Sequence, residues 1–178
     1  LDACNFVPSY FKQPESQSEK FWDVLCVTRP AFFKRVPLFL ETVRKLYDRK
    51  QYLRILCVSS MPKYQRSNRQ RTFYEFQERY LQMFNSDERR LFSLIMPTYD
   101  APFPFDLQTL SVFYKQSKVF VHFANDERRC RVAAYAWSTG LPVVAHECVG
   151  SLLPQDVAKE PYYYQIKNDS EFPDTILH

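Results

Sequence analysis

Glycine is scarce in this chain, with only Gly140 and Gly150 among 178 residues. Dinucleotide-binding turns of the form G-x-G-x-x-G and phosphate-binding loops of the form G-x-x-x-x-G-K-S/T need glycines at closer or different intervals. Two glycines ten residues apart cannot form either site. A phosphate bound by this protein must therefore be held by side chains or by the amides at a helix N-terminus.

No apolar run in the sequence approaches the roughly 18 residues that span a bilayer, so neither a signal peptide nor a membrane segment is expected from the residues given. Its five cysteines are odd in number and include no C-x-x-C pair, which favours reduced thiols and a cytoplasmic location. The net charge is only +4, well short of the dense positive stripe of a dedicated nucleic-acid-binding protein. Because the chain begins at Leu1 without an initiator methionine, we expect a piece of a longer protein, truncated at both ends.

Short β-type runs alternate with helical patterns along the chain. The expected strands are Asp23–Thr28, Tyr52–Ser59, Leu91–Met96, Lys118–Phe123, Pro142–His146 and Tyr162–Ile166. The expected helices are Val36–Arg49, Arg69–Phe84, Leu107–Lys115 and Glu127–Ser138. Such alternation is typical of a parallel sheet with right-handed crossovers. We therefore expect an α/β fold, a single Rossmann-like domain over residues 21–178 with a doubly wound sheet of about six strands, after an irregular lead-in over residues 1–20.

The usual strand order of this arrangement is 3-2-1-4-5-6, and its ligand crevice lies where the order reverses, at the carboxyl ends of the first and fourth strands. The segments that leave these two strands are residues 29–35 and 124–131. Both carry charge, unlike the apolar strands before them. Topology and charge therefore predict the same crevice.

Two cations, Arg29 and Lys34, lie in the first of these segments. Arginine offers a fork of donors and lysine a point charge, so together they can clamp a diphosphate without any glycine. The alternative is that both are ordinary solvated loop cations.

Glu127 begins the helix expected after the fourth strand, where the unpaired amides of residues 128–131 would form an anion site. An acidic residue here also fits helix capping and the helix dipole. The three arginines between residues 128 and 131 either add to the positive field or pair with the neighbouring carboxylates. Gly140, followed by Pro142, is the expected end of this helix and has a structural role.

A resemblance to a known family is carried by residues 119–145, VFVHFANDERRCRVAAYAWSTGLPVVA, and residues 25–35, LCVTRPAFFKR. The first run resembles the Glu-x7-Glu-Ala and Gly-x-Pro-Val-Val segment of retaining, nucleotide-sugar-dependent glycosyltransferases of the GT-B fold, group 1 type. The second resembles the Gly-Arg and Lys-Gly element of that family. The resemblance covers roughly residues 20–170 and implies the carboxy-terminal, donor-binding half of a two-domain enzyme.

The resemblance also implies roles for individual residues. Arg29 and Lys34 would hold the donor diphosphate and stabilise the leaving nucleotide, and Glu127 would lie at the donor sugar, so these three form the implied catalytic set. The other implied donor-binding residues are Met96, Thr98 and Tyr99 near the base, Cys130 and Arg131 at a phosphate, and Tyr135 at the ribose.

The chain departs from the family pattern at three positions. Tyr135 replaces the second glutamate, which usually holds the ribose hydroxyls, and a tyrosine cannot be a bidentate acceptor. Thr28 and Arg128 replace glycines. These departures indicate either an altered donor preference or an inactive relative.

The activity implied by the resemblance is metal-independent sugar transfer, with retention at the anomeric carbon, from a nucleoside-diphosphate sugar to an unknown acceptor in carbohydrate biosynthesis. No cofactor or metal is expected, and His122, His146 and His178 are scattered along the sequence. The acceptor site would belong mainly to a missing amino-terminal domain. We therefore expect the fragment alone to be inactive, and any peripheral membrane contact to involve that missing domain.

Two other functions stay open at this level. A non-catalytic GT-B-like interaction domain would fit Tyr135, with the Pro102–Phe105 loop as a docking surface or lid. A nucleic-acid-binding module would fit residues 63–74, KYQRSNRQRTFY, which mix cations with aromatics. The aromatics that follow recur at helical spacing and are expected to face the core, so no nucleic-acid partner is expected.

Overall fold

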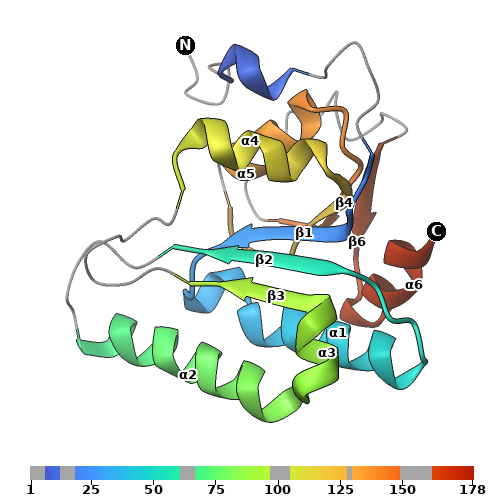
Figure 1. Cartoon of the computed structure of the whole chain (residues 1–178). Coiled ribbons are helices and arrows are strands. Elements are labelled where there is room, and N and C mark those ends of the chain that lie inside the picture. The colour runs from blue at the N-terminus through green and yellow to red at the C-terminus, as the bar shows by residue number, and fades with distance from the viewer. Residues whose placement is uncertain (1–6, 13–18, 61–66, 97–104, 128–129, 149–161) are drawn as a thin grey trace.

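A six-stranded parallel sheet forms the centre of the molecule, with the strand order β3-β2-β1-β4-β5-β6 (Figure 1). The computed structural model describes residues 7–12, 19–60, 67–96, 105–127, 130–148 and 162–178. The strands are β1 (Trp22–Thr28), β2 (Ile55–Ser59), β3 (Phe92–Ile95), β4 (Ser117–His122), β5 (Val143–His146) and β6 (Tyr163–Ile166). The expected fold class and strand order are confirmed, including the reversal between β1 and β4.

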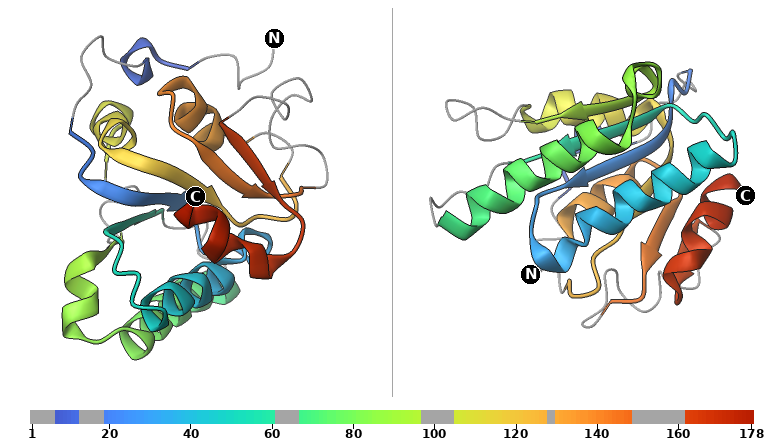
Figure 2. Two further views of the ribbon diagram at one scale, coloured as in Figure 1. Left: turned by 90° about the vertical axis from the view of Figure 1, so that its right-hand side faces the viewer. Right: turned by 90° about the horizontal axis from the view of Figure 1, so that it is seen from below.

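Helices cover both faces of this sheet. The α-helices are α1 (Val36–Asp48), α2 (Ser67–Met83), α3 (Ser86–Leu91), α4 (Leu107–Lys115), α5 (Arg131–Ser138) and α6 (Phe172–Leu177), and the 3-10 helices are η2 (Ser9–Phe11), η3 (Phe32–Lys34) and η5 (Asp169–Glu171). Figures 1 and 2 show α1, α2, α3 and α6 on one face, with α4 and α5 on the other. Among the described residues, none of these helices combines the length and apolar character needed to cross a membrane.

Several continuous apolar runs form strands that are covered on both faces, as expected, whereas the edge strand β6 exposes Tyr164 and Gln165. All five residues of β2 are buried. Cys26 of β1 lies opposite Cys57 of β2 in the strand register, and neither forms a disulfide. Both lie in the core as small apolar side chains. On α2, Phe73, Phe76 and Tyr80 are buried, which confirms that these aromatics face the core.

Several element ends differ from expectation by one to three residues, as in β2, which begins at Ile55 instead of Tyr52, and three other differences concern the local structure. Glu127 does not begin a helix, because α5 starts at Arg131 with Cys130 as its N-cap residue. The lead-in is not wholly irregular, since η2 buries Phe11 in the core. The helix α3 was not expected at all, because its six residues are too few for an apolar periodicity to be visible.

The link between β1 and α1 directs the charged segment toward β4. Its 3-10 helix η3 ends at Lys34 and is capped by Arg35, which has a left-handed backbone with φ of 49°. A left-handed residue reverses the chain direction locally, and Pro37 then fits the first turn of α1, where a missing amide donor costs nothing. This turn places Lys34 at the carboxyl edge of the sheet.

Candidate functional site

The two charged segments that follow β1 and β4 meet at the carboxyl edge of the sheet, as the topology predicted. The amide of Asn125 donates to the carbonyl of Phe33 at 3.3 Å, which joins the two loops. The ammonium group of Lys34 donates to Oε2 of Glu127, and these side chains are only 11% and 16% exposed. Lys34 and Glu127, two site residues predicted from the sequence, therefore form a hydrogen-bonded ion pair with each other.

Arg29 lies on the same loop but remains exposed. Its guanidinium carbon is 5.5 Å from the centroid of the Phe33 ring, and Nζ of Lys34 is 5.4 Å from the same centroid. Contacts of this kind hold a cation against an aromatic face. Both cations thus share one aromatic neighbour, while Lys34 also contacts Glu127.

Glu127 is held as an anion. Burial alone would raise its pKa, but the nearby His122 ring, the hydrogen bond from Lys34 and the charge of Lys34 outweigh burial and bring the pKa of Glu127 to about 2. Burial lowers the pKa of His122, and the charge of Lys34 lowers it further, against the opposing effect of Glu127. At neutral pH Glu127 is therefore a carboxylate and His122 a neutral imidazole.

A buried thiol completes this group, and sequence reasoning missed it. Sγ of Cys130 lies 3.6 Å from Nε2 of His122, and Nε2 lies 3.7 Å from Oε2 of Glu127. Burial raises the pKa of the Cys130 thiol to about 12, so the free thiol is protonated. The histidines are scattered in the sequence, but the fold brings His122 close to two other side chains that can bind a metal, Cys130 and Glu127. The available sequence signal was the interval H-x4-E-x2-C.

The other implied donor-binding residues are less closely grouped. Met96, just beyond β3, is partly buried against the core, and Arg131 is exposed at the first position of α5. Cys130 is buried in the group with His122. Thr98 and Tyr99 lie outside the described residues.

Tyr135, at the position of the family's second glutamate, is built into the core. It is 7% exposed, and its ring stacks on Phe11 with a centroid separation of 4.3 Å. Tyr114 meets the same ring edge-on at 6.4 Å. Phe105, from the loop suggested as a docking surface or lid, is likewise turned toward the core, where it meets Phe113 at 5.0 Å.

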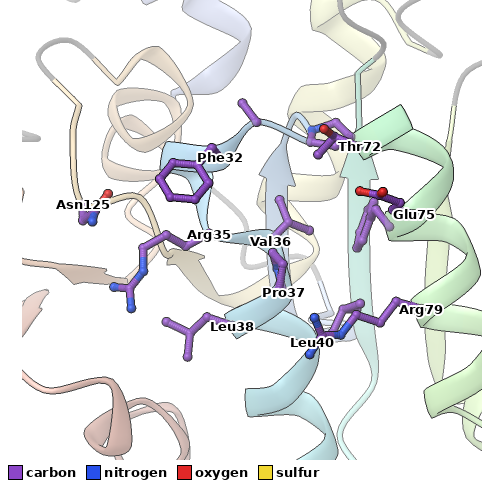
Figure 3. A pocket seen from close by; sticks show the side chains of 13 residues that line it. Phe32, Arg35, Val36, Pro37, Leu38, Leu40, Thr72, Glu75, Arg79 and Asn125 are labelled. Carbon is purple, nitrogen blue, oxygen red and sulfur yellow. The ribbon is translucent and has the colours of Figure 1, made fainter. Parts of the chain in front are cut away.

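Residues 29–35, which carry Arg29 and Lys34, are called the cation loop here. An apolar cavity of about 520 Å³ adjoins this loop, between the start of α1 and α2 (Figure 3). This volume falls in the range of small-molecule sites. Val36, Leu40 and Phe76 contribute apolar surface, and Phe32, at 98% exposure, projects at the rim. The loop that carries Lys34 therefore has Glu127 on one side and an apolar cavity on the other.

Comparison with known proteins identifies the fold. No family model and no curated relative matches the sequence. Among solved structures, the chain is similar to the C-terminal domain of the glycosyl transferase group 1 family protein LpcC from Francisella tularensis, with a TM-score of 0.68, 12% identity, and coverage of 94% of this chain and 83% of that one. It is similar to TarM with a TM-score of 0.66 and 18% identity, covering 97% of this chain and 30% of TarM.

A third similar structure is HepE from Anabaena, solved in complex with UDP and glucose. Its TM-score is 0.63 and its identity 13%, with coverage of 94% of this chain and 43% of HepE. The chain therefore has the fold of a GT-B glycosyltransferase domain. Its extent matches a carboxy-terminal domain such as that of LpcC, and it spans less than half the length of TarM or HepE.

Proposed function

We propose that this chain is the nucleotide-sugar-binding half of a retaining, metal-independent glycosyltransferase. The observation that carries the proposal is the ion pair between Lys34 and Glu127 at the point where the strand order reverses. Ligands of doubly wound sheets bind at this position. The complex of HepE with UDP and glucose supports a nucleoside-diphosphate sugar as the donor.

The cations would neutralise the donor diphosphate. An ammonium group has three donors, so Lys34 can keep its bond to Glu127 and still donate to phosphate oxygens. Arg29 is exposed on the same loop and can add a fork of donors from the solvent side. As the bond between sugar and diphosphate breaks, negative charge grows on the leaving phosphate, and fixed cations stabilise that charge.

Glu127 would orient the donor sugar. Its low pKa keeps it ionised throughout the neutral range, so it can accept hydrogen bonds from sugar hydroxyls but cannot act as a general acid there. The acceptor would be held mainly by an amino-terminal domain. The whole enzyme would act in carbohydrate biosynthesis in a reducing compartment such as the cytoplasm, which suits its free cysteines.

Calorimetric titration of the chain with UDP, GDP and ADP tests this proposal. At least one nucleotide should bind, and Lys34→Ala should weaken that binding by about tenfold or more, because a mostly buried charged donor is lost. Arg29→Ala should weaken it severalfold. The matched control is Lys45→Ala, which removes an exposed cation from the last turn of α1 and should leave affinity unchanged. No binding to any nucleotide, or binding indifferent to Lys34→Ala, would refute the proposal.

A non-catalytic interaction domain is the second candidate, and the burial of Tyr135 against Phe11 favours it. A side chain that packs the core is poorly suited to replace a ribose-binding carboxylate. Transfer assays separate the two functions once the chain is joined to its amino-terminal domain. Nucleotide binding with sugar transfer supports the enzyme, whereas binding without transfer supports the interaction domain. The chain alone should transfer no sugar.

A further inference from the structure

His122, Glu127 and Cys130 bring an imidazole, a carboxylate and a thiol to one point beside the Lys34 ion pair. Their ligand atoms all lie within 4.8 Å of one another, and His122 and Cys130 are each 2% exposed. Mixed nitrogen, sulfur and oxygen ligands suit zinc, whereas magnesium and calcium prefer oxygen alone. We infer that these three side chains form a binding site for Zn²⁺ or a similar borderline divalent cation, and that this cation competes with Lys34 for Glu127.

Two separations between the ligand atoms are close to those of a tetrahedral site, but the His122 ring must rotate to aim Nε2 at the metal, because Sγ of Cys130 lies 3.9 Å from Nδ1 as well as 3.6 Å from Nε2. Bonds of about 2.0–2.3 Å at tetrahedral angles place neighbouring ligand atoms roughly 3.3–3.7 Å apart. Nε2 of His122 is 3.6 Å from Sγ of Cys130 and 3.7 Å from Oε2 of Glu127. The third separation, from Cys130 to Glu127, is no more than 4.8 Å, so a small rotation of the Glu127 side chain closes the set.

The local fold holds two of the ligands in place. His122 is the last residue of β4, and Cys130 is the N-cap residue of α5, so the backbone of both is held by regular structure. Glu127 lies between them on the loop and reaches the crevice. Three protein ligands leave a fourth position for water or an anion.

Lys34 occupies the place of a counter-ion in the metal-free protein. Its ammonium group contacts Oε2 of Glu127, the oxygen that also faces His122. A divalent cation bound to that oxygen repels the ammonium group at short range in a partly buried site. Metal binding must therefore displace Lys34, and removal of its charge must strengthen metal binding.

The binding step is a simple ligand exchange. The metal loses water and gains bonds to Nε2 of His122, a carboxylate oxygen of Glu127 and Sγ of Cys130. The S–H bond of Cys130 breaks, its proton passes to the buffer, and no group is oxidised or reduced. Binding of one metal ion should therefore release about one proton. The inference goes beyond the proposed sugar transfer and needs no nucleotide for its test.

Titration of the reduced chain with Co²⁺, a spectroscopic substitute for Zn²⁺, tests the site. Expected are a sulfur-to-cobalt charge-transfer band, the strong visible bands of tetrahedral cobalt, and loss of both on addition of Zn²⁺. Cys130→Ser should abolish the charge-transfer band and the proton release. The matched control is Cys148→Ser, since that thiol donates to the carbonyl of Ala124 and lies outside the group. Far-ultraviolet circular dichroism checks that each variant is folded.

The variant Lys34→Met tests the site in the opposite direction, because it should strengthen metal binding instead of abolishing it. It keeps all three ligands and should bind Co²⁺ at least about tenfold more tightly than the wild type. The same variant should lose nucleotide affinity if the proposed function holds, so the two ideas can fail separately. A charge-transfer band that survives in Cys130→Ser, its loss in Cys148→Ser, or weaker metal binding by Lys34→Met would overturn the inference.

Discussion

Lys50 has a left-handed backbone, with φ of 60°, directly after Arg49, the C-cap residue of α1. Its amide donates to the carbonyl of Tyr47, and the amide of Gln51 donates to the carbonyl of Leu46. This pair of bonds is the Schellman helix end, where glycine is the usual residue. The helix α5 ends in the same way at Gly140, whose φ is 69°. The glycine-poor chain therefore uses glycine at one of these helix ends and lysine at the other.

Lys50→Gly should raise the free energy of unfolding by about 0.5–1 kcal/mol, because relief of left-handed strain exceeds the entropy that glycine adds to the unfolded chain. The side chain is exposed, so little contact is lost. Urea unfolding followed by circular dichroism measures the change. The control Lys45→Gly, inside the last turn of α1, should instead destabilise by about 1 kcal/mol. A lower urea midpoint for Lys50→Gly would contradict the explanation.

The central residues of the candidate site could be predicted from the sequence. Lys34 and Glu127 each follow an apolar strand closely, and the carboxyl ends of parallel strands share an edge. The approach of His122 to Cys130 could not be predicted, because it depends on the loop that delays α5 from residue 127 to residue 131. The burial of Tyr135 depends on Phe11, more than 100 residues earlier, and no local pattern reveals such a contact.

At the scale of elements, α3 shows how a short helix is stabilised without an apolar stripe. The side chain of Asn85 accepts from the amides of Asp87 and Glu88, and Glu88 accepts from the amide of Asn85. Glu88 also accepts two hydrogen bonds from Arg44 of α1, at 2.9 and 2.7 Å. The capping box therefore also joins α3 to α1.

The Arg44–Glu88 bond predicts a pH dependence. The side-chain hydrogen bond from Arg44 lowers the pKa of Glu88 in the folded protein, with smaller help from the Asn85 amide. A lowered folded pKa adds stability that is complete above the unfolded pKa, about 4.3, and is lost as pH falls through the folded pKa. Wild type should therefore exceed Glu88→Gln in unfolding free energy at pH 7, and the gap should narrow below about pH 4.

Urea unfolding of both proteins at pH 7 and at acidic pH measures this gap. Arg44→Gln should remove most of this pH dependence but not all of it, because it removes the main donor to Glu88 and leaves the bond from the Asn85 amide. A gap that stays constant on acidification would show that Glu88 acts only through packing.

The sequence predicted most elements but not all of their limits. The strands and α4 follow apolar runs and periodicity that are visible locally, and the bounds of α4 match expectation. Glu127 indicated a helix start because acidic residues are common at that position, but its carboxylate forms an ion pair with Lys34 instead. The signal for α3 was the Asn-x-x-Glu capping box at residues 85–88, which periodicity does not detect.

At the scale of the whole molecule, the carboxy-terminal helix α6 packs against α1 and β5. Phe172, at the start of α6, is fully buried and stacks on Phe123, beyond β4, with a centroid separation of 4.0 Å. Asp169 of η5 accepts from Arg35, the left-handed residue that precedes α1. The segment thus packs against the cation loop as well as against the core.

Phe172→Ala should lower the free energy of unfolding by about 3 kcal/mol or more, because a buried ring leaves a cavity behind. Thermal and urea unfolding measure the loss. The control Asp174→Asn is on the same helix, α6, and breaks an exposed ion pair with Arg49 at the end of α1. It should lower the free energy of unfolding by less than about 1 kcal/mol. Similar losses for both variants would show that α6 is held by charge rather than by its ring.

The overall topology was the most predictable property, since the alternation of strands and helices allows few arrangements once crossovers are right-handed. The position of the last residues could not be predicted, because no local sequence pattern indicates that Phe172 packs against Phe123. Long-range packing of this kind is decided by the assembled sheet.

The exposed ring of Phe32 has a practical consequence for work on the isolated chain. A fully solvated aromatic ring beside an apolar cavity of about 520 Å³ lets one molecule insert its ring into the cavity of another. Because Phe32 itself lines that cavity, two molecules related by a twofold axis can exchange rings, and such a contact closes into a dimer. Samples at high concentration should therefore dimerise, and Phe32→Ser should keep them monomeric in analytical ultracentrifugation.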